Sequence, residues 1–204
     1  MRPDVNRLSR IAGTLALDFT NTMAPRSGDR PIEYLIDARS VLEWGAHVGL
    51  CRRSEAAEWS KRMGEGARAA RFHAQALELR EAIFSVFVAV ATARRVPSRQ
   101  LRVVENAYRL ALGQSELSPS VDRFEWRSGG KGPERLLAAI VRDAVELLTS
   151  NRLHRVKLCA SPDDCGWLFL DATRSNTRRW CAMEVCGTQA KVRRQRAGRR
   201  AVRA

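Results

Sequence analysis

Four cysteines in the last quarter of the chain constrain its fold more than any other feature. Cys159 and Cys165 form a C-x5-C pair, Cys181 and Cys186 form a C-x4-C pair, and fifteen residues separate the two pairs. Such paired cysteines are typical of a tetrahedral zinc site, in which the metal replaces the core that a short segment lacks. Because all four ligands would be thiols, no coordination position stays open for a substrate. The spacing therefore predicts one structural Zn²⁺ ion rather than a catalytic metal.

The cysteines also allow other interpretations. Both loops are slightly longer than the commonest zinc knuckle, so the four thiols could be unligated members of a small β-rich core. His154 could compete as a ligand, although four cysteines suffice. The longest apolar stretch, residues 82–93, is too short to cross a bilayer as a helix, and no secretory segment is evident. We therefore expect no membrane partner and a reducing cytoplasmic location, where paired cysteines are more often metal ligands than disulfides.

Positive charge is concentrated behind the cysteines. The net charge is +14; residues 151–204 hold 13 Lys and Arg against 4 Asp and Glu, which is +9, and residues 1–150 hold 23 against 18, which is +5. This asymmetry points to a polyanionic partner, most often nucleic acid. A solvated, disordered terminus is the alternative, and we expect only the first turns of a helix to be ordered there. The tail after Gly187 contains seven basic residues and no acid: Lys191, Arg193, Arg194, Arg196, Arg199, Arg200 and Arg203.

Hydrophobic periodicity predicts a mainly α fold of the α+β class for the first 150 residues. The strongest pattern runs from Ala67 to Arg95, where apolar residues recur at steps of three and four. We divide the chain into a helical domain with short strands, residues 1–150, and a small treble-clef-like zinc finger with a basic helix or tail, residues 151–204. The other predicted elements are helices at 37–48 (capped by Asp37), at 54–64 (capped by Ser54), at 98–112 and at 133–148, and a strand at 121–126.

Within the finger, the sequence predicts a first knuckle, a hairpin, a second knuckle and a final helix. Residues 166–171 form a strand by composition, residues 173–176 a turn, and residues 177–180 a return strand. In that hairpin Trp167 and Trp180 would face each other, and such an aromatic cross-strand pair would support a module with little core. The helix would begin at Gly187.

Polar side chains follow an apolar segment near the start of the chain. Residues 15–19 alternate loosely and predict a short strand, and Asp18, Asn21 and Thr22 place polar groups beside it. These groups could line a ligand pocket, or Asp18 could receive an arginine from the finger. Simple turn capping by Asn21 and Thr22 is the alternative.

These motifs resemble a known family. The stretch CGWLFLDATRSNTRRWCAMEVCG (165–187), followed by Ala190, Lys191 and the arginines after it, closely resembles the CGNR zinc finger. The N-terminal LALDFTNT segment (15–22) resembles the opening motif of the ABATE domain that precedes this finger, and the resemblance covers nearly the whole chain. Where the family has Cys-Gly-Asn-Arg, this chain has Thr188 and Gln189 after Cys186 and Gly187, so a cationic contact is lost.

The resemblance implies a bacterial, stress-related transcription regulator in which the finger binds zinc and DNA. Carried over by position, the zinc ligands are the four cysteines named above. The N-terminal domain would then sense or dimerise. RNA or an acidic protein is the alternative partner, with a purely structural finger, and a small-molecule-binding domain is a third reading. No catalytic motif is present, so we expect no enzyme. The candidate nucleic-acid contacts are Arg174, Arg178, Arg179, Lys191, Arg193, Arg194, Arg196, Arg199 and Arg200.

Overall fold

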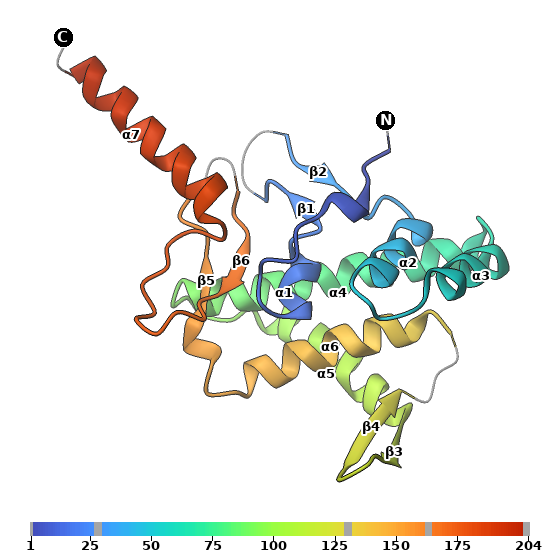
Figure 1. Ribbon diagram of the computed structural model, residues 1–204. Helices are drawn as coiled ribbons and strands as arrows, with labels where there is room; N and C mark the ends of the chain where they lie inside the picture. The colour runs from blue at the N-terminus through green and yellow to red at the C-terminus, as the bar shows by residue number, and fades with distance from the viewer. Residues whose placement is uncertain (1, 27–29, 129–131, 162–164, 202–204) are drawn as a thin grey trace.

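A computed structural model describes residues 2–26, 30–128, 132–161 and 165–201, and it confirms the mainly helical architecture with short antiparallel strand pairs (Figure 1). The described α-helices are α1 Leu15–Thr20, α2 Ala38–His47, α3 Arg53–Met63, α4 Ala67–Ala91, α5 Ser98–Gly113, α6 Glu134–Leu148 and α7 Thr188–Ala201. The described strands are β1 Met23–Ala24, β2 Ile32–Glu33, β3 Ser115–Pro119, β4 Phe124–Ser128, β5 Val156–Leu158 and β6 Leu168–Leu170. Short 3-10 turns lie at Val5–Arg7 and Leu153–Arg155, and a π-turn lies at Met183–Gly187.

One hydrophobic core joins the helices around α4. Its buried side chains include Phe72, Ala76, Leu79, Ile83 and Phe87 from α4, and these residues fall at three- and four-residue steps, as the sequence predicts. Phe19 of α1 packs against Trp44 of α2 with ring centroids 5.1 Å apart. Since Leu168 and Leu170 of β6 belong to the same core, the start of the finger packs directly on the helical domain.

Helix boundaries agree with the sequence where a local signal exists. Asp37 caps α2, because its side chain accepts a hydrogen bond from the backbone N–H of Ser40 at 2.7 Å. Gly64, with φ at +63°, ends α3 as predicted. The start of α3 differs: Arg52, two residues before the predicted cap Ser54, occupies the N-cap, and its N–H donates to Glu55 Oε2 at 2.8 Å. Helix α4 ends at Ala91, four residues before the predicted end.

Two predicted strands are wrong. Residues 15–20 form helix α1, whose start is capped by Thr14, because a helix can bury Ala16, Leu17, Phe19 and Thr20 together in the core. Residues 177–180 form no strand; instead β6 pairs with β5, in the register Val156↔Leu170 and Leu158↔Leu168. The sheet therefore flanks the first cysteine pair instead of following it, and Trp167 and Trp180 do not form a cross-strand pair. The predicted strand at 121–126 exists with a shifted start, as β4, paired with β3.

Candidate metal centre and nucleic-acid interface

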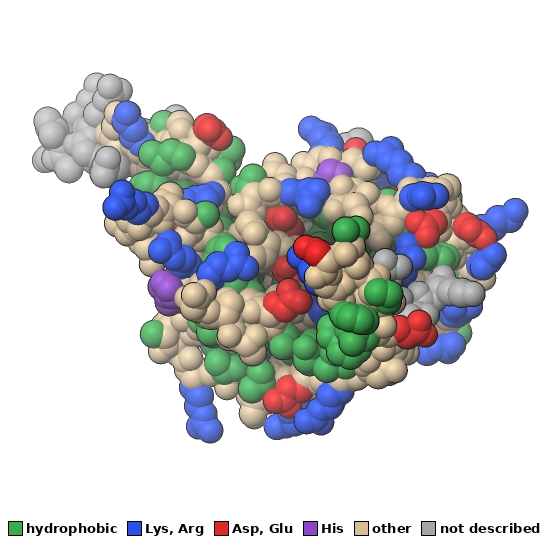
Figure 2. All heavy atoms as spheres, turned by 60° about the horizontal axis from the view of Figure 1, so that its bottom comes forward, with side chains coloured by type: hydrophobic (Ala, Val, Ile, Leu, Met, Phe, Trp, Pro, Cys, Tyr) green, Lys and Arg blue, Asp and Glu red, His purple; other side chains and the backbone are tan. Residues whose placement is uncertain are grey.

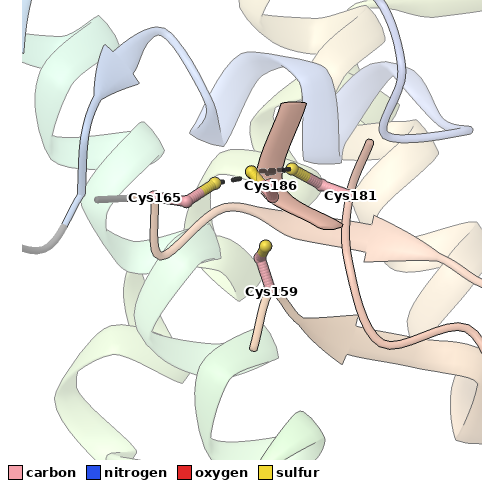
Figure 3. Close-up of side chains that lie close together, drawn as sticks. All are labelled: Cys159, Cys165, Cys181 and Cys186. Atoms are coloured by element: carbon pink, nitrogen blue, oxygen red, sulfur yellow. Dashed lines mark hydrogen bonds between the residues drawn. The ribbon is translucent and has the colours of Figure 1, made fainter. Parts of the chain in front are cut away.

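The four cysteines converge on one point (Figure 3). Their Sγ atoms all lie within 4.8 Å of one another, with Cys165 to Cys181 at 3.4 Å and Cys181 to Cys186 at 3.6 Å. All four side chains are buried. A disulfide requires an S–S distance of about 2.05 Å, and all four cysteines are free thiols. The spacing predicts that the two cysteine pairs, which lie apart in the sequence, come together in this way.

Zinc fits this donor set. Tetrahedral coordination with Zn–S bonds of about 2.3 Å places the sulfur atoms about 3.8 Å apart, and the observed separations bracket that value. The four thiols leave no position for water or substrate, so the centre suits one structural zinc ion. His154 is exposed and lies outside the group of potential ligands found among the described residues.

Backbone hydrogen bonds hold the ligands in place. The N–H of Cys159 donates to Trp167 O at 2.8 Å, which continues the β5–β6 ladder by one step. The N–H of Cys165 donates to Ser161 O at 3.0 Å, and the N–H of Cys186 donates to Ala182 O at 3.0 Å. A further bond from Ala160 N to Arg179 O, at 2.9 Å, ties the first knuckle to the segment before Cys181. The site is therefore built from turns on both sides of a very short sheet.

Crowding of the thiols opposes their joint ionisation. Hydrogen bonds from the thiols of Cys165 and Cys181 lower the pKa of Cys159. Burial raises the pKa of Cys186, and the nearby charge of Cys159 raises it further. One thiolate is thus easily formed in this cluster, whereas four thiolates together require a cation among them. When bound, zinc supplies that positive charge and replaces a hydrophobic core at this end of the molecule.

Asp171 organises the loop that leads to the second cysteine pair. Its buried carboxylate accepts hydrogen bonds from Lys157 Nζ at 2.7 Å, from Thr173 N and Oγ1, and from Arg178 N at 2.8 Å. Burial raises the pKa of Asp171, but these hydrogen bonds outweigh burial and hold the pKa below its usual range. The loop bearing Arg174 is therefore pinned at both ends.

The three arginines of this loop have different surroundings. Arg178 is half-buried: its guanidinium donates to Trp180 O at 2.8 Å and to Cys181 O, and lies 4.7 Å from the Phe169 ring centroid. These contacts tie Arg178 to the finger itself. Arg174 and Arg179 are exposed, and Arg179 lies over the ring of Trp180 at 5.2 Å.

Helix α7 begins two residues after Cys186 and projects away from the rest of the molecule (Figure 1). Helix α7 continues to Ala201, whereas the sequence predicts that only its first turns are ordered. Lys191 and Arg193 are exposed on it, as are Thr188 and Gln189 in its first turn. The side chains of Arg194, Arg196, Arg199 and Arg200, and all of Arg203, lie outside the described part of the chain.

Asn21 joins the helical domain to the finger. Its side-chain Nδ2 donates to Leu168 O at 2.9 Å, and its Oδ1 accepts from Leu168 N at 3.1 Å. Both bonds are buried, and they complete the ladder at the edge of β6. Asn21 is also the C-cap of α1. The same residue therefore ends the helix, as predicted, and holds the finger against the helical domain.

The contacts found for Asp18 and Thr22 lie within the helical domain. Asp18 Oδ1 accepts from the Ala12 N–H at 3.0 Å, and no ion pair joins it to an arginine among the described residues of the finger. Burial raises the pKa of Asp18 to about 6, although the Ala12 hydrogen bond opposes the shift. Thr22 Oγ1 donates to Phe19 O at 2.8 Å and accepts from Arg80 Nη1 at 3.2 Å. The three motif residues thus face different neighbours rather than one pocket.

Sequence reasoning missed several contacts that seat the finger. Arg26 N donates to Cys165 O at 2.6 Å, while the Arg26 side chain is buried against Phe84 and pairs with Glu81. Trp167 Nε1 donates to Met23 O at 3.0 Å, and Leu170 N donates to Ala12 O at 2.7 Å. No local pattern marks these partners, because every one of these contacts joins segments more than fifty residues apart.

Fold and site define a two-part protein, a helical domain carrying a four-cysteine zinc finger with a basic helix behind it. Comparison with family models agrees: residues 13–151 match the ABATE model, described as "Putative stress-induced transcription regulator", and residues 155–199 match the CGNR zinc finger. The chain belongs to the ABATE family and carries a CGNR zinc finger. Both families are regulator and zinc-finger types, not enzyme families. None of the curated proteins matches the chain. Among the described residues, no helix has both the length and the apolar character needed to cross a membrane.

Proposed function

We propose that this protein is a DNA-binding transcription regulator whose finger and helix α7 grip the DNA backbone. The observation that carries the proposal is the position of α7. This strongly basic helix starts within two residues of a buried metal ligand and projects clear of the body. A metal-anchored helix with exposed cations presents its charge in a fixed direction, which favours a regular polyanion over a random one.

Exposed cations on the finger extend this basic surface. Arg174 and Arg179 lie on the loop that Asp171 pins, and Lys191 and Arg193 lie on α7. The contacts of Arg178 favour a structural role, which leaves the exposed arginines as the better candidates for phosphate contacts. Because phosphate contacts position a protein without reading bases, this set supports affinity more than sequence choice.

Sequence discrimination should be modest. Thr188 and Gln189 occupy the exposed first turn of α7, where the family signature has asparagine and arginine. Glutamine can hydrogen-bond to a base but brings no charge. We propose that the helical domain supplies sensing or dimerisation, and that the protein acts in the bacterial cytoplasm, where its DNA is found. Catalysis is not part of the proposal.

A salt titration tests the proposal directly. If about five cations contact phosphates, the logarithm of duplex-DNA affinity should fall with the logarithm of salt concentration with a slope of roughly −4.5. Deleting residues 190–204 should remove most of that slope and leave the zinc content unchanged. Arg193→Ala with Arg194→Ala should weaken binding to all DNA sequences by similar factors.

The matched control removes the same charge elsewhere. Arg94 and Arg95 are exposed just after α4, so replacing both by alanine lowers the net charge equally without touching the finger. This control should bind DNA nearly as the wild type does. Salt-independent binding, or equal losses in the control and in the Arg193 and Arg194 variant, would refute the proposed interface.

A second candidate is a finger that contacts RNA or an acidic protein. Met183 and Val185 are exposed beside the start of α7, and an apolar pair beside a basic helix suits a protein or a splayed base better than a phosphate backbone. Tighter binding of single-stranded RNA than of duplex DNA at physiological salt would favour this candidate.

A small-molecule role has its own support in a groove of about 940 Å³ lined by α2, α3 and the start of α4.

A further inference from the structure

An apolar face is exposed on the β3–β4 hairpin. The register pairs Leu117 with Trp126 and Pro119 with Phe124, and since side chains alternate along a strand, these four residues share one face. Leu117 is 55%, Phe124 68% and Trp126 57% exposed. Figure 1 shows the hairpin extending from the helical domain at the end away from α7.

Exposed hydrophobic residues are concentrated in this part of the chain. Eleven large hydrophobic residues are exposed in the described part of the chain, and six of them lie between positions 110 and 126. In Figure 2, where this end of the molecule comes forward, hydrophobic side chains gather around the projecting hairpin. Exposed apolar surface on one face marks an interaction site on a folded protein. We call the four residues that share the hairpin face the hairpin patch: Leu117, Pro119, Phe124 and Trp126.

The apolar face of the hairpin has no second layer. A two-stranded sheet is marginally stable in water unless a further layer covers it. Hydrogen bonds from Arg142 Nη1 to Trp126 O at 3.4 Å and from Ser115 Oγ to Ala111 O at 2.6 Å join the hairpin to the helices. Among the described residues β3 and β4 pair only with each other, and the exposure of Leu117, Phe124 and Trp126 shows that no described element covers this face.

The charge of the hairpin favours a second copy of this chain as the occupant of this face. Residues 115–128 contain Glu116, Asp122 and Glu125 against Arg123 and Arg127, a net charge of −1 in a chain of +14. Two copies repel each other over most of their surfaces, and the hairpin is a place where they can approach without that repulsion. An acidic partner would instead be drawn to the basic surfaces.

The available area is consistent with a weak dimer. Aromatic side chains bury about 150–250 Å² each, so the exposed fractions of Phe124 and Trp126 amount to roughly 250 Å² per copy. Adding Leu117 and counting both copies brings the apolar area of the two hairpin faces to roughly 700 Å², which is the size of a weak, transient interface. One patch per chain that meets its own copy gives an isologous, twofold contact that closes at two subunits.

We propose that the hairpin patch is the interface of a homodimer in which the apolar faces of two β3–β4 hairpins pack against each other. The contact involves no residue of the finger, so it does not depend on DNA binding. Its consequence for the regulator is bivalence: two α7 helices on one particle raise the effective concentration of the second at DNA.

Sedimentation of the full-length, zinc-loaded protein without DNA tests the interface over about a hundredfold range of concentration. The average mass should rise from one to two chains. Added salt should strengthen this association, because it screens repulsion between two +14 chains, whereas it weakens DNA binding. Phe124→Thr with Trp126→Thr should keep the protein monomeric at the highest concentration, since threonine preserves strand propensity while removing the apolar surface.

The matched control changes the opposite face of the same hairpin. Glu116→Asp with Ser118→Thr keeps both the apolar face and the charge of the hairpin, and this variant should still dimerise. Helical circular dichroism and zinc content should match the wild type in both variants, which separates loss of the interface from loss of the fold. A wild type that stays monomeric throughout, or a Phe124 and Trp126 variant that dimerises like the wild type, would overturn the proposal. Loss of DNA binding by a protein that still dimerises would count against the proposed function alone.

Discussion

The β5–β6 sheet of this protein is shorter than the β3–β4 sheet, yet its side chains are more deeply buried. The β5–β6 sheet has only three residues per strand, yet Leu168, Phe169 and Leu170 are all buried. The β3–β4 sheet has five residues per strand, yet its Phe124 and Trp126 are exposed. The shorter sheet packs on the helical core on one side and on the thiol cluster on the other. The comparison teaches that a small sheet is secured by what covers its faces, and that extra ladder hydrogen bonds do not substitute for a cover.

Removing the metal should have the largest effect, because it uncovers one face of the β5–β6 sheet. Cys181→Ser deletes one ligand, and structural zinc contributes apparent binding free energies of about 10–16 kcal/mol. We expect loss of zinc and unfolding of residues 156–201, with most helical circular dichroism retained from α2 to α6. Elemental analysis should give one zinc per wild-type chain.

Cys51→Ser is the control for that experiment, because Cys51 is a half-buried thiol away from the cluster. It should keep both the zinc and the finger. A wild-type protein that is free of metal yet protected from proteolysis throughout the finger would contradict the role of the ion.

Removing the hydrogen bonds between the Asn21 side chain and β6 should have an intermediate effect. Asn21→Ala deletes both side-chain bonds to Leu168 and leaves a buried N–H and C=O without partners. The expected loss is about 2–4 kcal/mol of unfolding free energy, seen as a lower denaturant midpoint and faster hydrogen exchange in β6. The zinc content should not change, because Asn21 touches no ligand.

Asn6→Ala is the comparison variant, since Asn6 is exposed and its side chain donates a hydrogen bond to the nearby Asp4. It should change stability by a few tenths of a kcal/mol. Equal exchange rates in β6 for the Asn21→Ala variant and the wild type would show that the finger is held by its other contacts, such as Trp167 to Met23.

The smallest effect concerns pH. Burial raises the pKa of Asp18 on α1 to about 6 from 3.8, so between these values the folded state binds more protons than the unfolded state. Asp18 therefore adds stability at low pH that is lost as pH rises through about 6, by at most about 3 kcal/mol. Asp18→Asn should be more stable relative to the wild type at pH 7 than at pH 4, as denaturant titrations at both pH values would measure. A pH-independent difference would contradict the raised pKa of Asp18.

Local signals account for the correct predictions. Apolar residues at helical steps identified α4 and α6, Asp37 marked the start of α2, and the cysteine spacing identified the four ligands. Each of these depends on residues close together in the chain or on a metal whose geometry is known in advance. The same approach misread residues 15–19, because a short apolar run is equally compatible with a strand and a helix.

The order of residues is enough to predict the helical class, the zinc ligands and the positive charge behind the last cysteine. The strand that pairs with β6, the hydrogen-bond partner of the Asn21 side chain and the exposed hydrophobic face of the hairpin emerge only in the folded chain. Strand pairing, docking and burial depend on contacts between distant segments, whose partners no local pattern specifies. Periodicity, capping and metal ligation depend on bonds and side chains within reach along the chain, and these are written directly in the order of residues.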